Sequence, residues 1–174
     1  MYQVFYKKKI ILLTDVFKEG KDFKSFPIKD VKLKKVIKFL NKKNINSVHL
    51  FHKNKDKLLK YFFKLIPTVI AAGGKITNSK SETLFIYRND KWDLPKGKAE
   101  KNEQLPQTAL REVKEETGIK EVSINKPLDI TYHIFRRNNE YRLKVTYWFD
   151  MFSNYEGILF PQLDEGITDV KWVK

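Results

Sequence analysis

Three glutamates, Glu112, Glu115 and Glu116, are the residues of this sequence best suited to chemistry. A helix over about 105–117 would place them at positions i, i+3 and i+4, and therefore on one face. Three like charges within one helical turn repel one another, and a divalent cation is the simplest way to relieve that repulsion. Oxygen ligands suit Mg²⁺ or Mn²⁺, and Mg²⁺ keeps positions open for water and substrate phosphates. The spacing therefore suggests metal-dependent phosphate chemistry, with a solvated acidic face as the alternative.

The predicted helix has a second arc that can pack on a sheet. That arc holds Ala109, Leu110, Val113 and Thr117. Because the acids border it, we expect them at the edge of a core. Pro106 in the first turn and Gly118 after the last turn are residues typical of helix ends.

The stretch from 97 to 119 resembles the Nudix box, G-x5-E-x7-R-E-U-x-E-E-x-G-U, where U is a bulky aliphatic residue. Seven identities at fixed spacing arise by chance roughly once in 10⁸ windows. Asn102 stands where Nudix sequences often have glycine, a position that the defining pattern leaves open. Every specified position matches: Gly97, Glu103, Arg111, Glu112, Val113, Glu115, Glu116, Gly118 and Ile119.

The resemblance implies a role for each of these side chains. Glu112, Glu115 and Glu116 would bind the divalent ions, commonly joined by the backbone carbonyl of Gly97. Arg111 and Glu103 would orient the carboxylates through ion pairs. In this family a metal-activated water attacks a phosphorus of a nucleoside diphosphate linked to a further group X. The general base differs among members, and the candidates here are Glu115, Glu112 and, on the loop before the final strand, Glu165, followed by Asp164 and Glu156.

The substrate is predicted from the residues that lead into the box. W-D-L-P-K-G at 92–97 resembles the same segment of diadenosine polyphosphate and diphosphoinositol polyphosphate hydrolases. Lys96, Lys98 and Arg88 could contact the extra phosphates of such a chain. A dinucleoside polyphosphate is the leading substrate, while ADP-ribose, an inositol pyrophosphate and an RNA 5′ end stay open. Strand aromatics are more often core than base-stacking groups; those considered are Tyr132, Phe135, Tyr147 and Trp148.

Composition limits the other function classes. The 174 residues include no cysteine, which excludes disulfides, thiolate metal sites and cysteine nucleophiles. No apolar run approaches the ~18 residues of a membrane span, and the N-terminus is a poor signal peptide, so we expect a cytoplasmic protein. A Nudix protein that senses nucleotides without cleaving them is the alternative class, but the complete box favours an enzyme.

The positive charge is concentrated in the first third of the chain. Residues 1–66 contain 18 lysines and five acidic residues, within a net charge of +14 for the chain. Binding of RNA or another polyanion would use such charge. However, 30 of the 35 basic residues are lysine, whereas specific phosphate recognition favours arginine. We interpret most of this charge as solvated and do not favour nucleic acid as a partner.

The hydrophobic pattern predicts two α/β domains. Residues 1–66 fit a small ββαβα domain, with strands over 2–6, 10–13 and 46–52, helices over 31–43 and 55–66, and an irregular segment over 15–30. His49, His52 and His133 are interpreted as surface or hydrogen-bonded histidines.

Residues 67–174 resemble the Nudix α/β/α sandwich with a mixed sheet. The expected strands cover 68–77, 83–88, 121–135, 141–152 and 168–173. Nudix domains usually continue into another helix that covers the second sheet face. We expect the N-terminal helices or a partner subunit, as in a homodimer, to cover it here.

Overall fold

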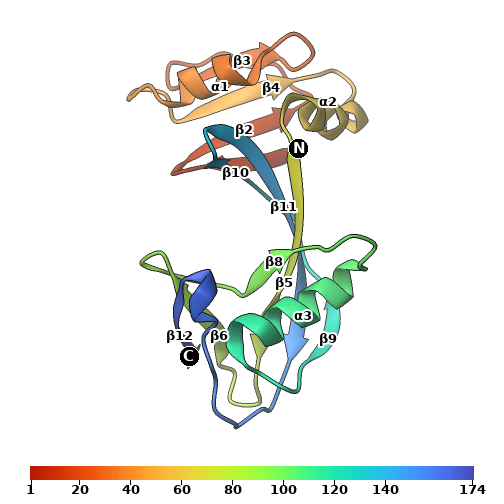
Figure 1. Ribbon diagram of the computed structural model, residues 1–174. Coiled ribbons are helices and arrows are strands. Elements are labelled where there is room, and N and C mark those ends of the chain that lie inside the picture. The colour runs from red at the N-terminus through yellow and green to blue at the C-terminus, as the bar shows by residue number, and fades with distance from the viewer. The chain divides into compact units, whose positions relative to one another are not determined.

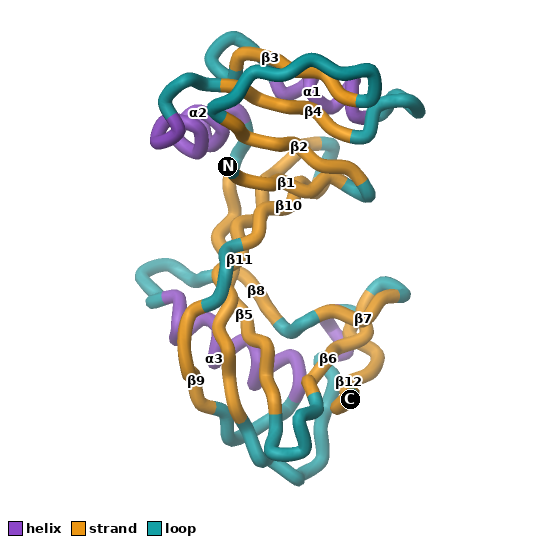
Figure 2. The backbone as a smooth tube through the Cα atoms, turned by 180° about the vertical axis from the view of Figure 1, so that it is seen from behind, coloured by secondary structure: helices purple, strands orange, loops and turns teal.

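The computed structural model describes residues 1–174, drawn from opposite sides in Figure 1 and Figure 2. The chain divides into two compact units. Unit 1 comprises Met1–Val69 and Thr131–Val145, and unit 2 comprises Ile70–Ile130 and Thr146–Lys174. Each unit is therefore built from two separate segments of the sequence.

Unit 1 contains a sheet with the strand order β11-β10-β1-β2-β4-β3, to which β11 (Glu140–Phe152) contributes its residues up to Val145. Strand β1 pairs antiparallel with β2 and parallel with β10, while β2, β4 and β3 are parallel neighbours. The parallel pair β1–β10 joins the first strand of the chain to a segment that follows the box. The strands are β1 (Tyr2–Tyr6), β2 (Lys9–Thr14), β3 (Phe23–Pro27), β4 (Ser47–Phe51) and β10 (Thr131–Arg137).

Two short helices cover one face of this sheet. They are α1 (Leu33–Leu40) and α2 (Leu58–Leu65), the latter preceded by a 3-10 turn, η1 (Lys55–Lys57). Their apolar sides are buried, and only one face of the sheet is fully buried, so both helices pack there. Figure 1 shows α1 in front of the sheet and Figure 2 shows it behind. The buried sheet residues are Val4, Ile11, Leu13, Val48 and Leu50, and the buried helix residues are Val36, Ile37, Leu40, Leu58 and Phe62.

The predicted helices and strands of residues 1–66 are confirmed, with one correction. Residues 15–30 were expected to be irregular, but Phe23–Pro27 forms the edge strand β3. Only β4 pairs with it, and Lys24, Ser25 and Pro27 weaken its strand signal in the sequence. Edge positions tolerate such residues because one side of the strand forms no ladder.

Unit 2 contains a mixed sheet with the core strand order β12-β6-β5-β11. Short strands extend it, since β7 pairs with β6, β8 with β5 and β9 with β11. The predicted α/β class is confirmed. The strands are β5 (Thr68–Thr77), β6 (Thr83–Arg88), β7 (Lys91–Asp93), β8 (Lys96–Lys98), β9 (Ser123–Pro127), β11 (Glu140–Phe152) and β12 (Ile167–Val173), and the turn η2 (Leu163–Glu165) precedes β12.

Helix α3 (Leu105–Thr117) has the bounds predicted from the sequence. It begins with a capping box in which Gln104 and Gln107 bond each other's backbone, and it ends at Gly118 in the left-handed region, with φ 71°. Its apolar side packs in one core with the central strands, formed by Ala72, Ile76, Leu84, Ala109, Val113, Ile119, Phe149 and Met151.

None of the helices has the length and apolar character needed to cross a membrane.

Candidate active site

Strand β8 and helix α3 meet at Gly97 and Glu112. A Cβ atom added to Gly97 would lie 1.8 Å from Glu112 Oε2. Gly97 is held there because β8 pairs with β5, where Gly97 is opposite Ala72. A larger residue at 97 would displace the carboxylate, so this close approach explains why a glycine starts the motif.

Arg111 connects the acidic residues of the motif. Its Nε donates to Glu103 Oε1 at 2.8 Å, and its Nη2 donates to Glu103 Oε2 at 2.9 Å. Its Nη1 donates to Glu112 Oε1 at 2.8 Å and to Glu115 Oε2 at 2.9 Å. The Lys98 carbonyl accepts a further bond from Nη2, at 3.2 Å. The planar fork of arginine suits this task, because one side chain holds three carboxylates in fixed directions.

Glu103 is kept ionised by its donors. The pKa of Glu103 falls to about 2, mainly through the Arg111 hydrogen bonds and then through the Glu100 N–H. Thr108 Oγ1 also donates to Glu103 Oε2 at 2.8 Å. Thr108 is fully buried and was not among the residues predicted for the site. Its place one turn before Arg111 on the same helix face was the signal that could have identified it.

Glu116 lies inside the protein, and the expectation that it stands at the core edge is wrong. Its side chain is 0% exposed. Oε2 accepts the Lys96 N–H at 2.7 Å, whereas Oε1 has no hydrogen-bond partner. The pKa of Glu116 is raised to about 7, chiefly by burial, against the lowering effects of Lys96 and Arg88. Burial also raises the pKa of Glu112, although Arg111 opposes the shift.

Arg88 connects Glu116 to Glu165, the acid predicted on the loop before the final strand. Arg88 Nη1 lies 3.6 Å from Glu116 Oε1 and 3.2 Å from Glu165 Oε2. Glu165 is in η2, and its charge is among the influences that raise the pKa of Glu112. The structure therefore brings the loop acid and the box helix together.

The two predicted lysines take different positions. Lys96 Nζ pairs with Asp93 Oδ2 at 3.1 Å, and Asp93 is a residue that the sequence analysis did not select. Lys98 enters the site through its backbone carbonyl, while its side chain is exposed.

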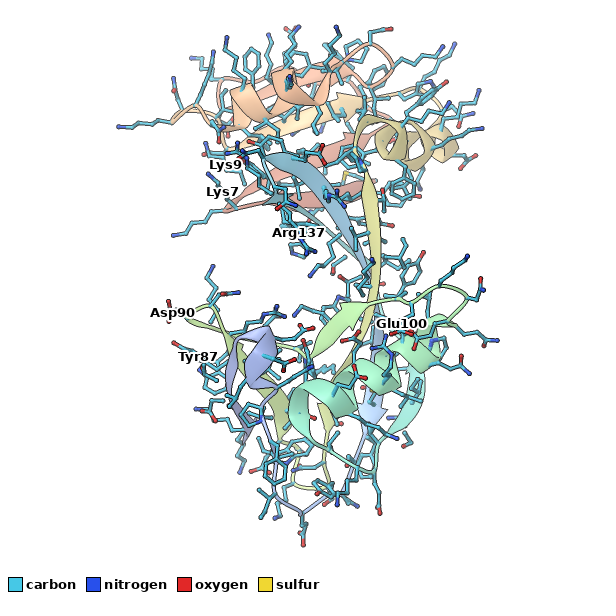
Figure 3. All side chains as sticks on the ribbon, in the orientation of Figure 1. Lys7, Lys9, Tyr87, Asp90, Glu100 and Arg137 are labelled. Atoms are coloured by element: carbon cyan, nitrogen blue, oxygen red, sulfur yellow. The ribbon has the colours of Figure 1, made fainter.

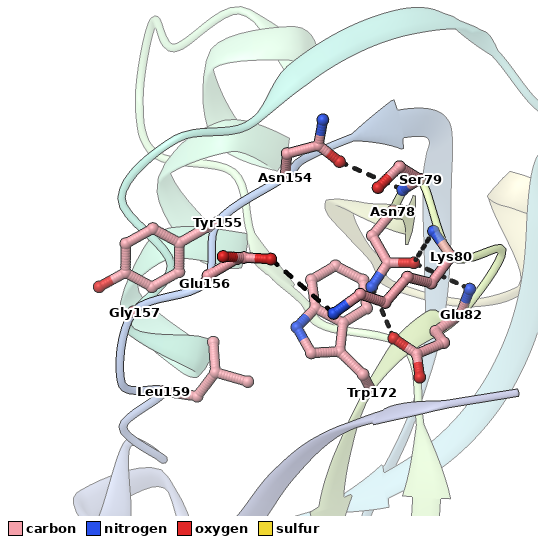
Figure 4. Close-up of a pocket in the computed structure, with 10 residues that line it drawn as sticks. All are labelled: Asn78, Ser79, Lys80, Glu82, Asn154, Tyr155, Glu156, Gly157, Leu159 and Trp172. Atoms are coloured by element: carbon pink, nitrogen blue, oxygen red, sulfur yellow. Dashed lines mark hydrogen bonds and ion pairs between the residues drawn. The ribbon is translucent and has the colours of Figure 1, made fainter.

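Several other predicted residues lie elsewhere. Glu156 is 3.8 Å from Lys80 Nζ, at a separate cavity of about 570 Å³ that Trp172 also lines (Figure 4). The aromatic residues considered for base stacking are divided, with Tyr132 and Phe135 in unit 1 and Tyr147 and Trp148 in unit 2.

The histidines have structural partners. His49 stacks on Phe23 and is bonded to Ser47, His52 Nδ1 accepts from the Asn54 N–H, and His133 stacks on Phe5.

The residues of the motif fit a divalent cation. The structure holds no group of three His, Cys, Asp or Glu side chains that already encloses an ion site. However, Glu116 Oε1 is a buried anionic oxygen that accepts no hydrogen bond, and a directly bound cation is the usual partner of such an oxygen. Gly97 leaves open the space beside Glu112 that a side chain would fill. Carboxylate and carbonyl oxygens are donors suited to Mg²⁺ or Mn²⁺.

Comparison with known proteins gives one family match. The NUDIX domain model matches residues 67–174. Similar solved structures include the MutT protein from Methanosarcina mazei Go1, which is 28% identical with a TM-score of 0.47 over 62% of this chain and 78% of that chain. The C. elegans Ap4A hydrolase in a binary complex is 22% identical, with a TM-score of 0.48 over 61% and 80%. A MutT NUDIX hydrolase from Burkholderia pseudomallei is 21% identical, with a TM-score of 0.46 over 61% and 82%.

Proposed function

This chain belongs to the Nudix family of hydrolases, and from that premise we propose that it cleaves a phosphoanhydride bond of a dinucleoside polyphosphate with Mg²⁺ or Mn²⁺. The family match confirms the resemblance predicted from residues 97–119. The observation that carries the metal-dependent part of the proposal is the buried Glu116 carboxylate, whose Oε1 has no hydrogen-bond partner. Arg88 Nη1, at 3.6 Å, is too distant for a hydrogen bond, so this buried oxygen is costly to keep unless a cation binds it directly.

The proposed metal ligands are Glu112, Glu115, Glu116 and the Gly97 carbonyl. When bound, a divalent ion offsets phosphate charge and lowers the pKa of an attacking water. The protein's own contribution is to hold the ligands in place. Arg111 bonds both Glu112 and Glu115, and the Lys96 N–H fixes Glu116.

Glu103 supports this arrangement without being a proposed ligand. It receives two bonds from Arg111 and one from Thr108. Because Glu103 stays ionised, it holds the guanidinium in one orientation, and the fork then directs Glu112 and Glu115. We assign Arg111 and Glu103 as positioning residues.

Three carboxylates are candidates for the general base. Glu112 and Glu115 are bound by Arg111, and Glu165 is bound by Arg88 at 3.2 Å. Glu165 is half-exposed and does not belong to the proposed ligand set, so it is free to accept a proton from water. The pH dependence of kcat in Glu165→Gln and Glu115→Gln separates these roles. The variant whose kcat no longer falls at low pH is the one that has lost the general base.

The choice of a polyphosphate rests on the residues around the carboxylates. Arg88 and Lys96 lie against Glu116, and Lys98 is exposed on the same strand as Gly97. The W-D-L-P-K-G segment resembles that of diadenosine polyphosphate hydrolases. Arg88 and the exposed Lys98 are the cations that could contact phosphates beyond the first two. ADP-ribose, an inositol pyrophosphate and an RNA 5′ end are the competing substrates, and nucleotide sensing without hydrolysis is the competing function.

A substrate panel tests the proposal. Diadenosine tetraphosphate, ADP-ribose, an inositol pyrophosphate and triphosphorylated RNA are assayed with Mg²⁺, with Mn²⁺ and with chelator, and the products are identified. The expected result is metal-dependent cleavage, with the highest kcat/KM for the tetraphosphate. Cleavage of another substrate alone would overturn the substrate, and binding without cleavage of any would overturn the enzymatic role.

A matched pair of variants sharpens the substrate assignment. Arg88→Gln removes a cation next to Glu116, whereas Lys80→Gln removes one at the separate cavity. Arg88→Gln should raise the KM for the tetraphosphate more than the KM for ADP-ribose. Lys80→Gln should leave both KM values unchanged. An equal effect of Arg88→Gln on both substrates would contradict a contact with the additional phosphates.

A further inference from the structure

The sheet of unit 1 has a face that carries rings and is not covered by a helix. Cross-strand register places His133, Phe5, Ile10, Ser47 and Phe23 in one row across β10, β1, β2, β4 and β3. The helices cover the other face, where Val4 and Ile11 are fully buried. The loop 15–22 contacts the β4–β3 side of the ring-bearing face, where Phe17 packs against Phe51. On the β10-β1-β2 side, Gln3 and His133 are exposed and Phe5 and Ile10 are half-buried.

Rings on this face form two stacked pairs. Phe5 and His133 have centroids 5.1 Å apart and planes 23° apart, and Phe23 and His49 are 4.1 Å and 16° apart. Phe135 is two residues beyond His133 in β10 and so projects from the same face. Flat rings on an open sheet are the groups on which unpaired nucleic-acid bases stack.

Cations gather at one end of this sheet. The parallel pair Tyr6↔Ile134 places the β1–β2 turn beside the end of β10. Lys9 Nζ donates to the carbonyls of Lys42 and Ile45, both at 2.6 Å, which ties the loop after α1 to the same end. Figure 3 shows Lys7 and Lys9 near each other at this end. This cationic end consists of Lys7, Lys8, Lys9, Lys42, Lys43, Arg136 and Arg137.

No acid neutralises the cationic end. None of its seven residues takes part in an ion pair. Lys7 also has a φ of 55°, whereas five of the other six non-glycine residues with positive φ are Asn or Asp. A lysine in that conformation costs about 1–2 kcal/mol. Uncompensated charge of this kind favours an anionic partner.

We propose that this face of unit 1 binds single-stranded nucleic acid. Backbone phosphates contact the cationic end, and bases stack on Phe5 and His133. A duplex would offer phosphates but no unstacked bases. An anionic membrane would also be attracted by charge, but the large apolar residues most exposed in unit 1, Met1, Val16, Phe17 and Phe63, are not in this row. The proposal is independent of the hydrolase substrate.

Fluorescence anisotropy with the full-length chain tests the proposal. The probes are a labelled 12-nucleotide RNA, its duplex, and vesicles of phosphatidylserine and phosphatidylcholine. The single strand should bind more tightly than the duplex, with log Kd rising linearly with log salt. Equal or tighter duplex binding, vesicle binding without RNA binding, or no RNA binding overturns the proposal.

Variants separate stacking from bulk charge. Phe5→Leu keeps apolar volume without a ring and should weaken single-strand binding roughly 5- to 100-fold. Lys7→Asn with Lys8→Gln removes two charges, and Asn suits the φ of residue 7, so folding should be preserved. This double substitution should reduce the slope of log Kd against log salt by about 1.4, since each phosphate contact contributes ~0.7.

The matched control removes two lysines from the exposed side of α1. Lys34→Gln with Lys38→Gln changes net charge equally on the other side of the unit and should have a much smaller effect. Equal losses in the two lysine pairs would show a non-specific charge effect and overturn the assigned face, as would unchanged binding by Phe5→Leu. Turnover of the small substrate should stay at the parent's value in every variant, and each variant should still unfold in one cooperative transition.

Discussion

The Cα atom of Gly97 approaches the Glu112 carboxylate so closely that a Cβ atom on residue 97 would lie 1.8 Å from Oε2. This contact joins the first residue of the Nudix motif to one of its central acids, 15 positions later in the chain. The constraint is steric, because Gly97 does not have a positive φ. It therefore acts on the position of Glu112 and not on the local backbone.

Gly97→Ala is expected to impair catalysis more than folding. The added methyl group must displace the Glu112 carboxylate, a small movement that would misplace a proposed metal ligand. We expect turnover to fall by about two orders of magnitude, roughly 3 kcal/mol of transition-state stabilisation. Steady-state kinetics and the melting temperature in chelator measure the two effects.

A double mutant supplies the control for this contact. Glu112→Asp shortens the side chain and makes room for the methyl group, so Gly97→Ala should cost little more in that background. Additive losses in the double mutant would show that the two residues act independently.

Arg111→Lys should lower activity although the charge is kept. Lysine cannot reproduce the paired bonds to Glu103 while also bonding Glu112 and Glu115. We expect turnover to fall roughly 10- to 100-fold, with a smaller metal-induced rise in melting temperature. Arg142→Lys is the matched control, because Arg142 makes a single 3.4 Å pair with the exposed Glu140. Similar effects of both substitutions would contradict a positioning role for Arg111.

The box helix could be predicted from the sequence because its signals are local. Pro106, the apolar arc and Gly118 mark the bounds 105–117 that the structure shows. Asn102 has a φ of 66°, so asparagine takes the left-handed conformation for which related sequences often use glycine. Edge strand β3 was missed, because its one partner, β4, is distant in sequence and Lys24, Ser25 and Pro27 interrupt its apolar pattern.

Burial within the site could not be predicted from helix spacing. The three acids were placed on one arc, yet Glu115 is exposed while Glu116 is fully buried. The difference arises from strand β8, whose Lys96 N–H bonds Glu116. The pairing of β1 with β10 could not be predicted either, since nothing in the sequence of either strand specifies a partner about 130 residues away.

Deletion of residues 1–66 should give an insoluble or poorly folded remainder. Strand β10 would lose its β1 partner, and the buried Tyr132 and Ile134 would lose the cover of the sheet and helices of unit 1. An unpaired apolar edge promotes aggregation. The measurement is the soluble yield of residues 67–174, alone and co-expressed with residues 1–66. Rescue by co-expression is expected, and a soluble, fully active fragment on its own would refute the prediction.

His49 should make the stability of unit 1 sensitive to mild acid. Burial against Phe23 lowers the pKa of His49 below 6.5, helped by the charge of Lys18 and opposed by Asp22. The folded state therefore binds fewer protons than the unfolded state just below pH 6.5. The stabilisation that neutral His49 gives the folded state is fully present above pH 6.5 and is lost as the pH falls through the pKa of His49 in the folded state.

His49→Phe is the variant that tests this linkage, because it keeps a stacking ring without a titrating group. Between pH 7.5 and 5.5 the parent's melting temperature should fall more than the variant's. An NMR titration of the imidazole should give a midpoint below 6.5. Parallel melting curves, or a midpoint above 6.5, would disprove the linkage.

Glu116→Gln should stabilise the metal-free protein and inactivate the enzyme. In chelator, the substitution replaces a fully buried carboxylate that has one unpartnered oxygen. The Gln carbonyl can still accept the Lys96 N–H, while the negative charge is removed from the interior. We expect the unfolding free energy to rise by about 1 kcal/mol, seen as a higher melting temperature than the parent's in chelator.

With Mg²⁺ the parent should have a higher melting temperature than Glu116→Gln. The parent should gain melting temperature because the ion binds the native carboxylates and not the unfolded chain, whereas Glu116→Gln should gain little. Its turnover should fall by two or more orders of magnitude, roughly 3 kcal/mol. Glu156→Gln removes an exposed acid at the separate cavity and should leave both quantities unchanged. Parent-like turnover in Glu116→Gln, or no Mg²⁺-dependent shift in the parent, would rule out Glu116 as a metal ligand.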